Sequence, residues 1–289
     1  MQSNNETNFL NQPTNDHIPI SQRASEPILL APSLLVSLNS SVIRFSRDFK
    51  KTEEIQIRNL TKGMKCLVLN NDEILIAGGV NKSAFKYNVS QRLFSNLPDL
   101  LTPRRFFGFS FIGDCPAVIG GMIDGKRVGN VEILINSEWI QIESLRIPRL
   151  HTSAIRHGNN TYVFGGISVK INAEIEKYEA GAGWINLRVK IPDRIVKFGL
   201  AYSEDSIFLL GGKSKKRRFR NKKQKIKEKN RKIQVYRFNV YSQTFTALRL
   251  LAYPFRTENA GSAVYCDGII YLLNKSYRGV INYIPNILI

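Results

Sequence analysis

The fold is decided by the stretch "HTSAIRHGNNTYVFGG", residues 151–166. Two short runs rich in β-branched and aromatic residues flank a polar turn, and the second run ends in the glycine pair Gly165 and Gly166. Asn159 lies in the turn, six residues before Gly165, where Asn and Asp are favoured because they tolerate tight-turn backbone conformations. The stretch therefore predicts a β-hairpin that is closed by two glycines.

The same ending occurs three more times, as "EILIAGG", "PAVIGG" and "IFLLGG". The first glycines of consecutive pairs are 42, 45 and 46 residues apart, and a step of six residues back reaches a turn residue each time (Asp72, Asp114, Asn159 and Asp205). From Asp267 the same step reaches Leu273, so a fifth unit keeps the turn without the glycines. A fixed period of this size indicates one repeated supersecondary unit. We assign the structural repeat motif to Gly78, Gly79, Gly120, Gly121, Gly165, Gly166, Gly211, Gly212, Trp139 and Trp184.

Each unit contains a second pair of β-patterned runs, which gives four strands per unit. An aromatic residue falls on the last strand each time, at Phe94, Trp139, Trp184 and Phe245. Large rings at this position can pack between neighbouring sheets. An arginine precedes each following unit by a similar distance, at Arg104, Arg149, Arg194 and Arg256.

A unit of about forty-five residues with these features resembles the kelch repeat, and the resemblance covers roughly residues 60 to 285. It implies an all-β fold, a kelch-type β-propeller. We count four good units, one weakened unit and a fragment, which predicts six blades with the ring closed by strands from both termini. Five blades are the alternative. About thirty polar residues before the first strand are too few for a BTB or F-box domain, which many kelch proteins carry.

The resemblance leaves two roles open for the repeated arginines. In the family's repeat this residue holds neighbouring blades together, which is a structural role. The alternative is that Arg104 and Arg149 contact a partner, because the connections into each blade open on the face that commonly receives protein ligands in kelch propellers.

The ends of the chain and its cysteines suggest domain limits and a compartment. Residues 1–27 are polar and Asn-rich, which is typical of a disordered tail, and the propeller is expected over 28–289. No run of eighteen apolar residues and no signal peptide occurs, so we expect no membrane span. Three cysteines, an odd number, suit a reducing compartment. We therefore expect a cytoplasmic monomer.

Residues 213–232 form a basic insertion in the fourth good unit. They carry thirteen Lys or Arg and one Glu, or +12 of the formal net charge of +19. Such a run repels itself and is expected to be disordered. It is either a tolerated surface loop or a contact for a polyanion such as RNA, an anionic lipid or an acidic protein. The candidate partner-binding residues are Lys215, Lys216, Arg217, Arg218, Arg220, Lys222 and Lys223, and the same run fits a nuclear-import pattern.

Catalytic chemistry has little support in the sequence. His17, His151 and His157 have no metal-site spacing, and the adjacent carboxylates lie at the repeat's turn positions. We therefore expect no catalytic, cofactor-binding or metal-binding residues. The favoured function is a non-enzymatic protein-interaction scaffold or adaptor, the alternative is polyanion binding through 213–232, and an enzyme of the propeller type is a more distant alternative.

Overall fold

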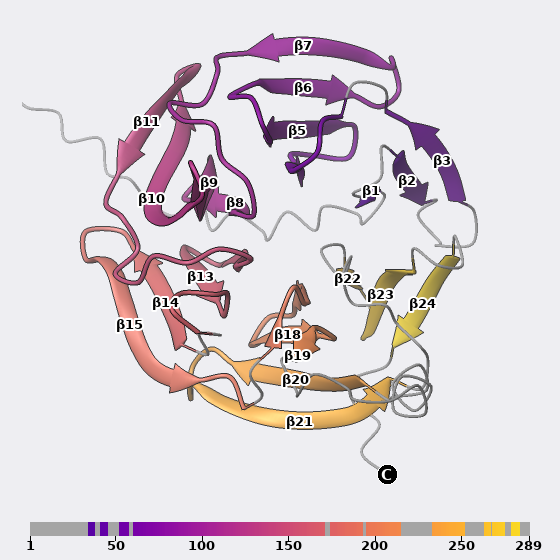
Figure 1. Cartoon of the computed structure of the whole chain (residues 1–289). Helices are drawn as coiled ribbons and strands as arrows, with labels where there is room; N and C mark the ends of the chain where they lie inside the picture. Colours follow the sequence, from indigo (N-terminus) through magenta and orange to yellow (C-terminus); the bar gives the residue numbers. More distant parts are fainter. Residues whose placement is uncertain are drawn as a thin grey trace, which may run out of the picture.

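The computed structural model describes residues 34–37, 41–45, 52–57, 60–170, 174–192, 195–214, 233–251, 263–266, 268–274 and 279–283. Every regular element within these ranges is a β-strand, and the sheets are arranged around a common centre (Figure 1). The fold is thus all-β and propeller-like. The expected tail, residues 1–27, lies outside the described residues.

Four sheets are complete blades of four antiparallel strands, and each corresponds to one glycine-pair unit. Blade 1 comprises β4 (Met64–Val68), β5 (Glu73–Gly78), β6 (Ala84–Asn88) and β7 (Leu93–Leu97). Blade 2 comprises β8 (Gly108–Ile112), β9 (Cys115–Ile123), β10 (Lys126–Ile135) and β11 (Glu138–Ile142). Blade 3 comprises β12 (Ser153–His157), β13 (Asn160–Phe164), β14 (Glu174–Glu179) and β15 (Gly183–Lys190). Blade 4 comprises β17 (Gly199–Tyr202), β18 (Ser206–Leu210), β20 (Ile233–Asn239) and β21 (Thr244–Leu251).

Two further sheets have three strands each. One comprises β1 (Leu34–Ser37), β2 (Ser41–Phe45) and β3 (Thr52–Gln56), and the other comprises β22 (Ala263–Cys266), β23 (Ile269–Asn274) and β24 (Gly279–Tyr283). The described chain therefore has four complete blades, and the expectation of six blades, or of five, is corrected. The ring was expected to be closed by strands from both termini, and among the described strands each terminal segment forms a three-stranded sheet of its own.

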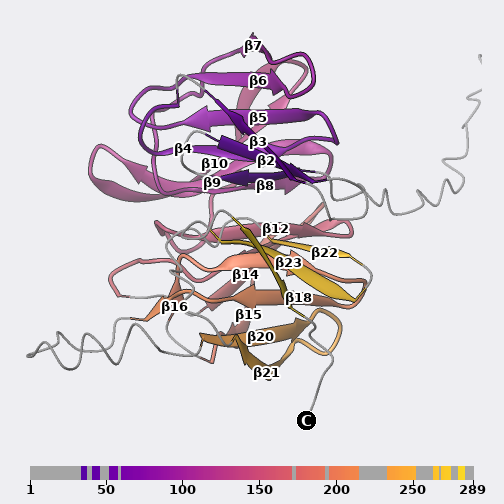
Figure 2. The same ribbon diagram turned by 90° about the vertical axis from the view of Figure 1, so that its right-hand side faces the viewer.

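The strands of a blade are arranged in order from the centre of the molecule to its edge. In Figure 2 the strands of blade 1 are stacked from β4 near the middle to β7 at the edge. Each pair of consecutive complete blades shares its own apolar core. Trp139 of β11 packs with Leu75 and Phe107 between blades 1 and 2, and Trp184 of β15 packs with Ile119 and Val163 between blades 2 and 3. The outer-strand tryptophans thus pack between sheets, as the repeat pattern predicted.

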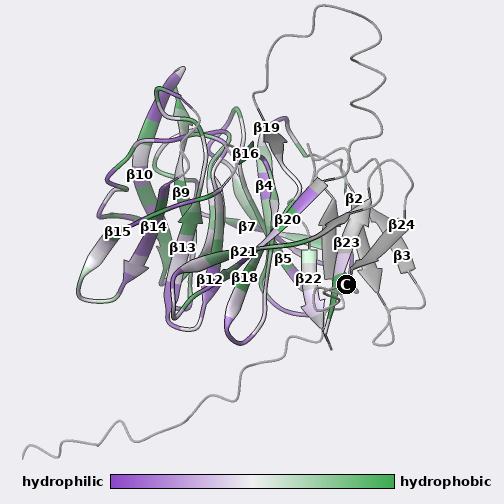
Figure 3. Ribbon diagram, turned by 90° about the horizontal axis from the view of Figure 1, so that it is seen from below, coloured by the Kyte–Doolittle hydropathy of each residue, from purple (hydrophilic) through white to green (hydrophobic). Residues whose placement is uncertain are grey.

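The two ends of the molecule differ in the connections that they carry. One end carries the turns between the first and second strands and between the third and fourth strands of a blade. The other end carries the glycine pairs, which follow the second strand, together with the lead-in segments before each blade. We call the second end the glycine-pair face. In Figure 3 the short strands β16 (Ile195–Val196) and β19 (Lys213–Ser214) and the tip of the β9–β10 hairpin lie at this end, and the β17–β18 turn lies at the other.

The basic insertion is joined to blade 4 at the glycine-pair face. Its first two residues form β19, which pairs with β16 in the lead-in segment of the same blade. The third strand, β20, begins at Ile233, directly after the insertion. Residues 215–232, including all seven candidate partner-binding residues of the insertion, lie outside the described residues.

Candidate functional site

The glycine pairs of blades 1 and 2 connect each of these two blades to the next through the backbone. The Gly79 N–H donates to the carbonyl of Arg104, and the Gly121 N–H donates to the carbonyl of Arg149, both at 2.9 Å. Gly121 has a φ of 107°, and a Cβ atom there would lie 2.8 Å from the backbone oxygen of Arg105. Only glycine fits such a position, because the conformation and the close approach both exclude a side chain.

Arg104 is buried in the lead-in segment of blade 2, with 1% of its surface exposed. Its guanidinium forms an ion pair with Glu132 of β10 and also donates to the backbone oxygens of Gly120 and Asn130. The Glu132 carboxylate accepts a further hydrogen bond from the N–H of Leu101, in the segment that leaves blade 1. The pair therefore fastens the connection between blades 1 and 2 to the third strand of blade 2.

Arg149 repeats this arrangement one blade further on. It is fully buried, pairs with Glu176 of β14 and donates to the backbone oxygens of Gly165 and Glu174. Burial lowers the pKa of both guanidinium groups, and the paired carboxylates oppose that shift. We call the Arg104–Glu132 and Arg149–Glu176 pairs the buried clamps.

This geometry decides between the two roles that the repeat pattern left open for Arg104 and Arg149. Their side chains are buried and their terminal nitrogens bind groups of the chain itself, so a partner at the surface could not reach them. The assignment of both residues to partner binding is therefore corrected to a structural one. Arg194 and Arg256 lie outside the described residues.

The clamps are specific to blades 2 and 3. Glu132 and Glu176 occupy the third-strand position that pairs with the residue two before the first glycine. The same position holds Phe85 in blade 1 and Tyr236 in blade 4. Blade 1 also lacks the arginine, because the residue sixteen before Gly78 is the exposed Lys62.

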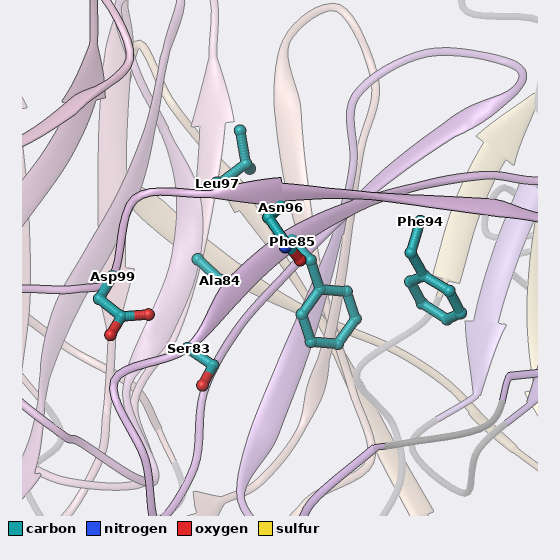
Figure 4. Close-up of a pocket in the computed structure, with 7 residues that line it drawn as sticks. All are labelled: Ser83, Ala84, Phe85, Phe94, Asn96, Leu97 and Asp99. Carbon is teal, nitrogen blue, oxygen red and sulfur yellow. The ribbon is translucent and has the colours of Figure 1, made fainter.

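A groove of about 500 Å³ opens on blade 1 where the clamp is missing (Figure 4). The rings of Phe85 and Phe94 lie side by side in it, with their centroids 5.2 Å apart. Phe94 stands at the position of Trp139 and Trp184 but is 40% exposed. Asp99 is the one titratable side chain in the lining, so the groove supplies no acid–base pair. Its lining residues are Ser83, Ala84, Phe85, Phe94, Asn96, Leu97 and Asp99.

A second group of side chains gathers at the centre of the glycine-pair face. Phe106, His151 and Lys197 each lie fourteen residues before the first glycine of their blade, and all three have a left-handed backbone, with φ values of 61°, 57° and 59°. The centroids of the Phe106 and His151 rings are 4.3 Å apart, and the backbone N–H of His151 donates to the carbonyl of Phe106 at 2.7 Å. Lys65 of β4 is half-buried beside them, and its Nζ lies 5.7 Å from the centroid of the Phe107 ring. We call Lys65, Phe106, His151 and Lys197 the central cluster.

The central cluster is electrostatically unusual. Burial lowers the pKa of Lys65 to about 8, and burial together with repulsion from Lys197 and Lys65 lowers the pKa of His151 to about 4. In the described part of the chain neither lysine forms an ion pair, and no carboxylate acts on the His151 imidazole. Sequence reasoning missed this group, although the shared offset of fourteen residues from the glycine pairs was visible in the sequence.

Among the described residues, no group of three or more His, Cys, Asp or Glu side chains could hold a metal ion. Within the same ranges, no helix is long and apolar enough to cross a membrane. The two cysteines whose side chains the structure describes, Cys66 and Cys115, are free thiols.

Comparison with known proteins supports the repeat assignment. No family model matches the chain. The chain is 25% identical over 115 residues to Kelch repeat protein C2 of vaccinia virus (strain Western Reserve) and to its counterpart of cowpox virus (strain GRI-90). Kelch repeat protein C2 of camelpox virus (strain CMS) has the same identity over the same length. Each match covers 38% of this chain and 22% of the relative.

Proposed function

The distant similarity and the propeller-like fold together support a kelch-repeat family for this chain, and from that premise we propose that it is a non-enzymatic protein-interaction module. We assign the contact to the glycine-pair face. The observation that carries this proposal is that the buried clamps hold the lead-in segments of blades 2 and 3, while the side chains of the central cluster are only partly buried. Binding residues on connecting segments held by a rigid scaffold are a common arrangement.

Exposed apolar side chains at this face support the same assignment. Val169 and Val80 follow the glycine pairs of blades 3 and 1, and their exposed fractions are 93% and 60%. Exposed apolar side chains of this kind offer a protein partner a contact that is desolvated on binding.

Cross-linking mass spectrometry with partners captured from a native extract tests the proposal. We expect cross-links to fall on the glycine-pair face, and we expect Val169→Asp to reduce capture. The matched control is Tyr241→Asp, because Tyr241 is also exposed, at 77%, but lies in a turn at the opposite end. Cross-links confined to the opposite end, or equal loss in both variants, would overturn the proposal.

The alternative, polyanion binding through residues 213–232, is supported by the share of charge in that run, +12 of +19. Binding of this kind weakens steeply with salt because it releases condensed counterions. Replacing residues 215–232 by a Gly/Ser loop of equal length would abolish RNA binding under this alternative and leave capture of a protein partner unchanged under the first.

A further inference from the structure

We propose that the groove on blade 1 binds a segment of a protein partner in which an aromatic side chain lies near a Lys or Arg. The groove is lined by residues of β6 and of β7, the outermost strand of the blade, and by residues next to these strands. It shares no residue with the central cluster. This inference goes beyond the proposed function, which concerns the glycine-pair face.

Blades 2 and 3 use two polar groups to hold the segment that leaves the preceding blade. The indole N–H of Trp139 donates to the carbonyl of Pro98 at 2.9 Å, and that of Trp184 donates to the carbonyl of Glu143 at 3.0 Å. The acids of the two buried clamps accept backbone N–H groups from the same segments. Both indole rings are buried in this arrangement, with exposed fractions of 5% and 0%.

Blade 1 has phenyl rings at both of these positions. Phe94 stands in place of the tryptophan and Phe85 in place of the acid, so this blade offers neither the indole donor nor the carboxylate acceptor. Phe94 is 40% exposed as a result. The surface that is covered in blades 2 and 3 is therefore open in blade 1, where an apolar group of a partner can be buried against it.

The rings of the groove are fixed by their neighbours. The ring of Phe94 meets that of Phe85 edge-on at a centroid distance of 5.2 Å, and that of Tyr87 in a tilted arrangement at 4.7 Å. Tyr87 is 3% exposed, and Phe85 packs against the same core. An aromatic side chain of a partner gains edge and offset contacts with such rings, and little side-chain order is lost on binding because they are already held.

The charge in the groove selects a cation. Among the described lining residues Asp99 carries the one charge, and its side chain is exposed. Figure 4 shows Asp99 at one end of the groove and Phe94 at the other, with Phe85 between them. The faces of the phenyl rings are also regions of negative potential. A Lys or Arg of the partner is therefore favoured near Asp99, and an acidic side chain is repelled.

The probe is a fluorescently labelled peptide of sequence GSWSSRSG, and its binding to the full chain is measured by fluorescence anisotropy. In an extended peptide the three residue steps from the Trp to the Arg span about 10 Å. One reference peptide, GSASSRSG, lacks the ring, and the other, GSWSSESG, carries an acid in place of the Arg. The two references separate recognition of the ring from recognition of the charge.

Two substitutions test the groove, each with a matched control. Phe94→Ala removes the exposed ring, and its control is Leu93→Ala, since Leu93 is the adjacent residue of β7, is 60% exposed and points to the other face of the sheet. Asp99→Asn removes the charge, and its control is Asp124→Asn at the exposed tip of the β9–β10 hairpin. Circular dichroism checks that each variant is folded. Asp99→Asn changes only an exposed side chain, so it tests the groove even if Phe94→Ala does not fold.

We expect Phe94→Ala to weaken binding of the probe about tenfold and Asp99→Asn about threefold, while each control changes the affinity by less than about twofold. GSASSRSG and GSWSSESG should each bind at least about tenfold more weakly than the probe. Equal binding of the probe and GSASSRSG, or equal losses in Phe94→Ala and Leu93→Ala, would overturn the inference.

Self-association is the other occupancy that the experiment separates. Sedimentation velocity of the wild type and of Phe94→Ala is measured at the concentrations of the binding assay. A wild-type dimer that Phe94→Ala converts to a monomer would mean that a second copy fills the groove, and the inference would be wrong. We expect the same monomeric sedimentation for both proteins. Failure of the peptide test leaves the cross-linking result untouched, so the two proposals can fail separately.

Discussion

Blades 2 and 3 each hold a buried clamp at the glycine-pair face, whereas blade 1 has Lys62 and Phe85 at the corresponding positions and carries Lys65 nearby. All three blades have the same strand order and the same glycine pair, so the difference does not arise from the fold. The positions that form a stabilising ion pair in blades 2 and 3 form no such pair in blade 1. The contrast shows how a repeat can separate structural residues from residues that are available for binding.

The largest effect is expected from the clamps. Glu176→Gln removes the carboxylate that pairs with the buried guanidinium of Arg149, which should destabilise the protein by about 3–5 kcal/mol. Urea denaturation of the variant measures this loss. Lys62→Met in blade 1 is the control and should change stability by about 0.5 kcal/mol or less, since Lys62 is exposed. Equal effects at both sites would mean that the clamps have no special role.

The next effect concerns the glycine pairs. Gly121→Ala should cost about 2–3 kcal/mol, because it combines a left-handed backbone with a Cβ atom 2.8 Å from the carbonyl oxygen of Arg105. Gly113→Ala is the matched control, since Gly113 has a φ of 56° but no atom within 4 Å of the added Cβ. Thermal unfolding separates the two contributions, and equal losses would show that backbone strain alone sets the cost.

The central cluster should show an effect of the opposite sign. Lys65→Met removes a half-buried charge, so it should raise the free energy of unfolding at pH 7 by about 1–2 kcal/mol. In the wild type the unfolded state holds this proton more tightly, with an ordinary pKa of 10.5 against about 8 when folded. The gain should therefore be largest below pH 8 and fade between pH 8 and 10.5. A loss of stability at pH 7 would contradict the picture of an uncompensated lysine.

The smallest effect is the pH dependence due to His151. Its pKa falls from the ordinary 6.5 to about 4 on folding, so between these values the unfolded state binds more protons. Stability should therefore decrease as the pH is lowered from 6.5 to 4, and His151→Asn should flatten this part of the profile. Denaturant midpoints collected across that range measure the slope. A variant with the wild-type slope would show that other groups cause it.

The repeat itself was predictable because its determinants are local. A left-handed glycine pair, a polar turn and an outer-strand ring are each required by one hairpin or one sheet interface, so they appear in the sequence at fixed spacing. The packing of Trp139 and Trp184 between sheets followed from that spacing, and the structure confirms it.

The missed features depend on contacts between distant parts of the chain. The number of complete blades depends on whether the sheet at each terminus forms a fourth strand. The terminal segments lack the motif residues that would predict such a strand. The burial of Arg104 depends on Glu132, twenty-eight residues away in a strand that the repeat motif does not define. Lys65 was missed because its departure from the repeat becomes visible only when strand pairing aligns it with Gly108, Ser153 and Gly199.

The hydrogen bonds from Gly79 and Gly121 have a direction, because blades 1 and 2 each donate to the lead-in segment of the next blade. During synthesis the N–H of Gly79 or of Gly121 therefore lacks its partner in the chain until about 25 further residues, up to Arg104 or Arg149, have been added. We expect folding on the ribosome to trail synthesis by roughly half a repeat. A chain that stops between two blades would leave this backbone N–H of its last blade without its partner in the next lead-in segment. We therefore expect the last blade of a truncated chain to unfold more readily and to be degraded by proteases.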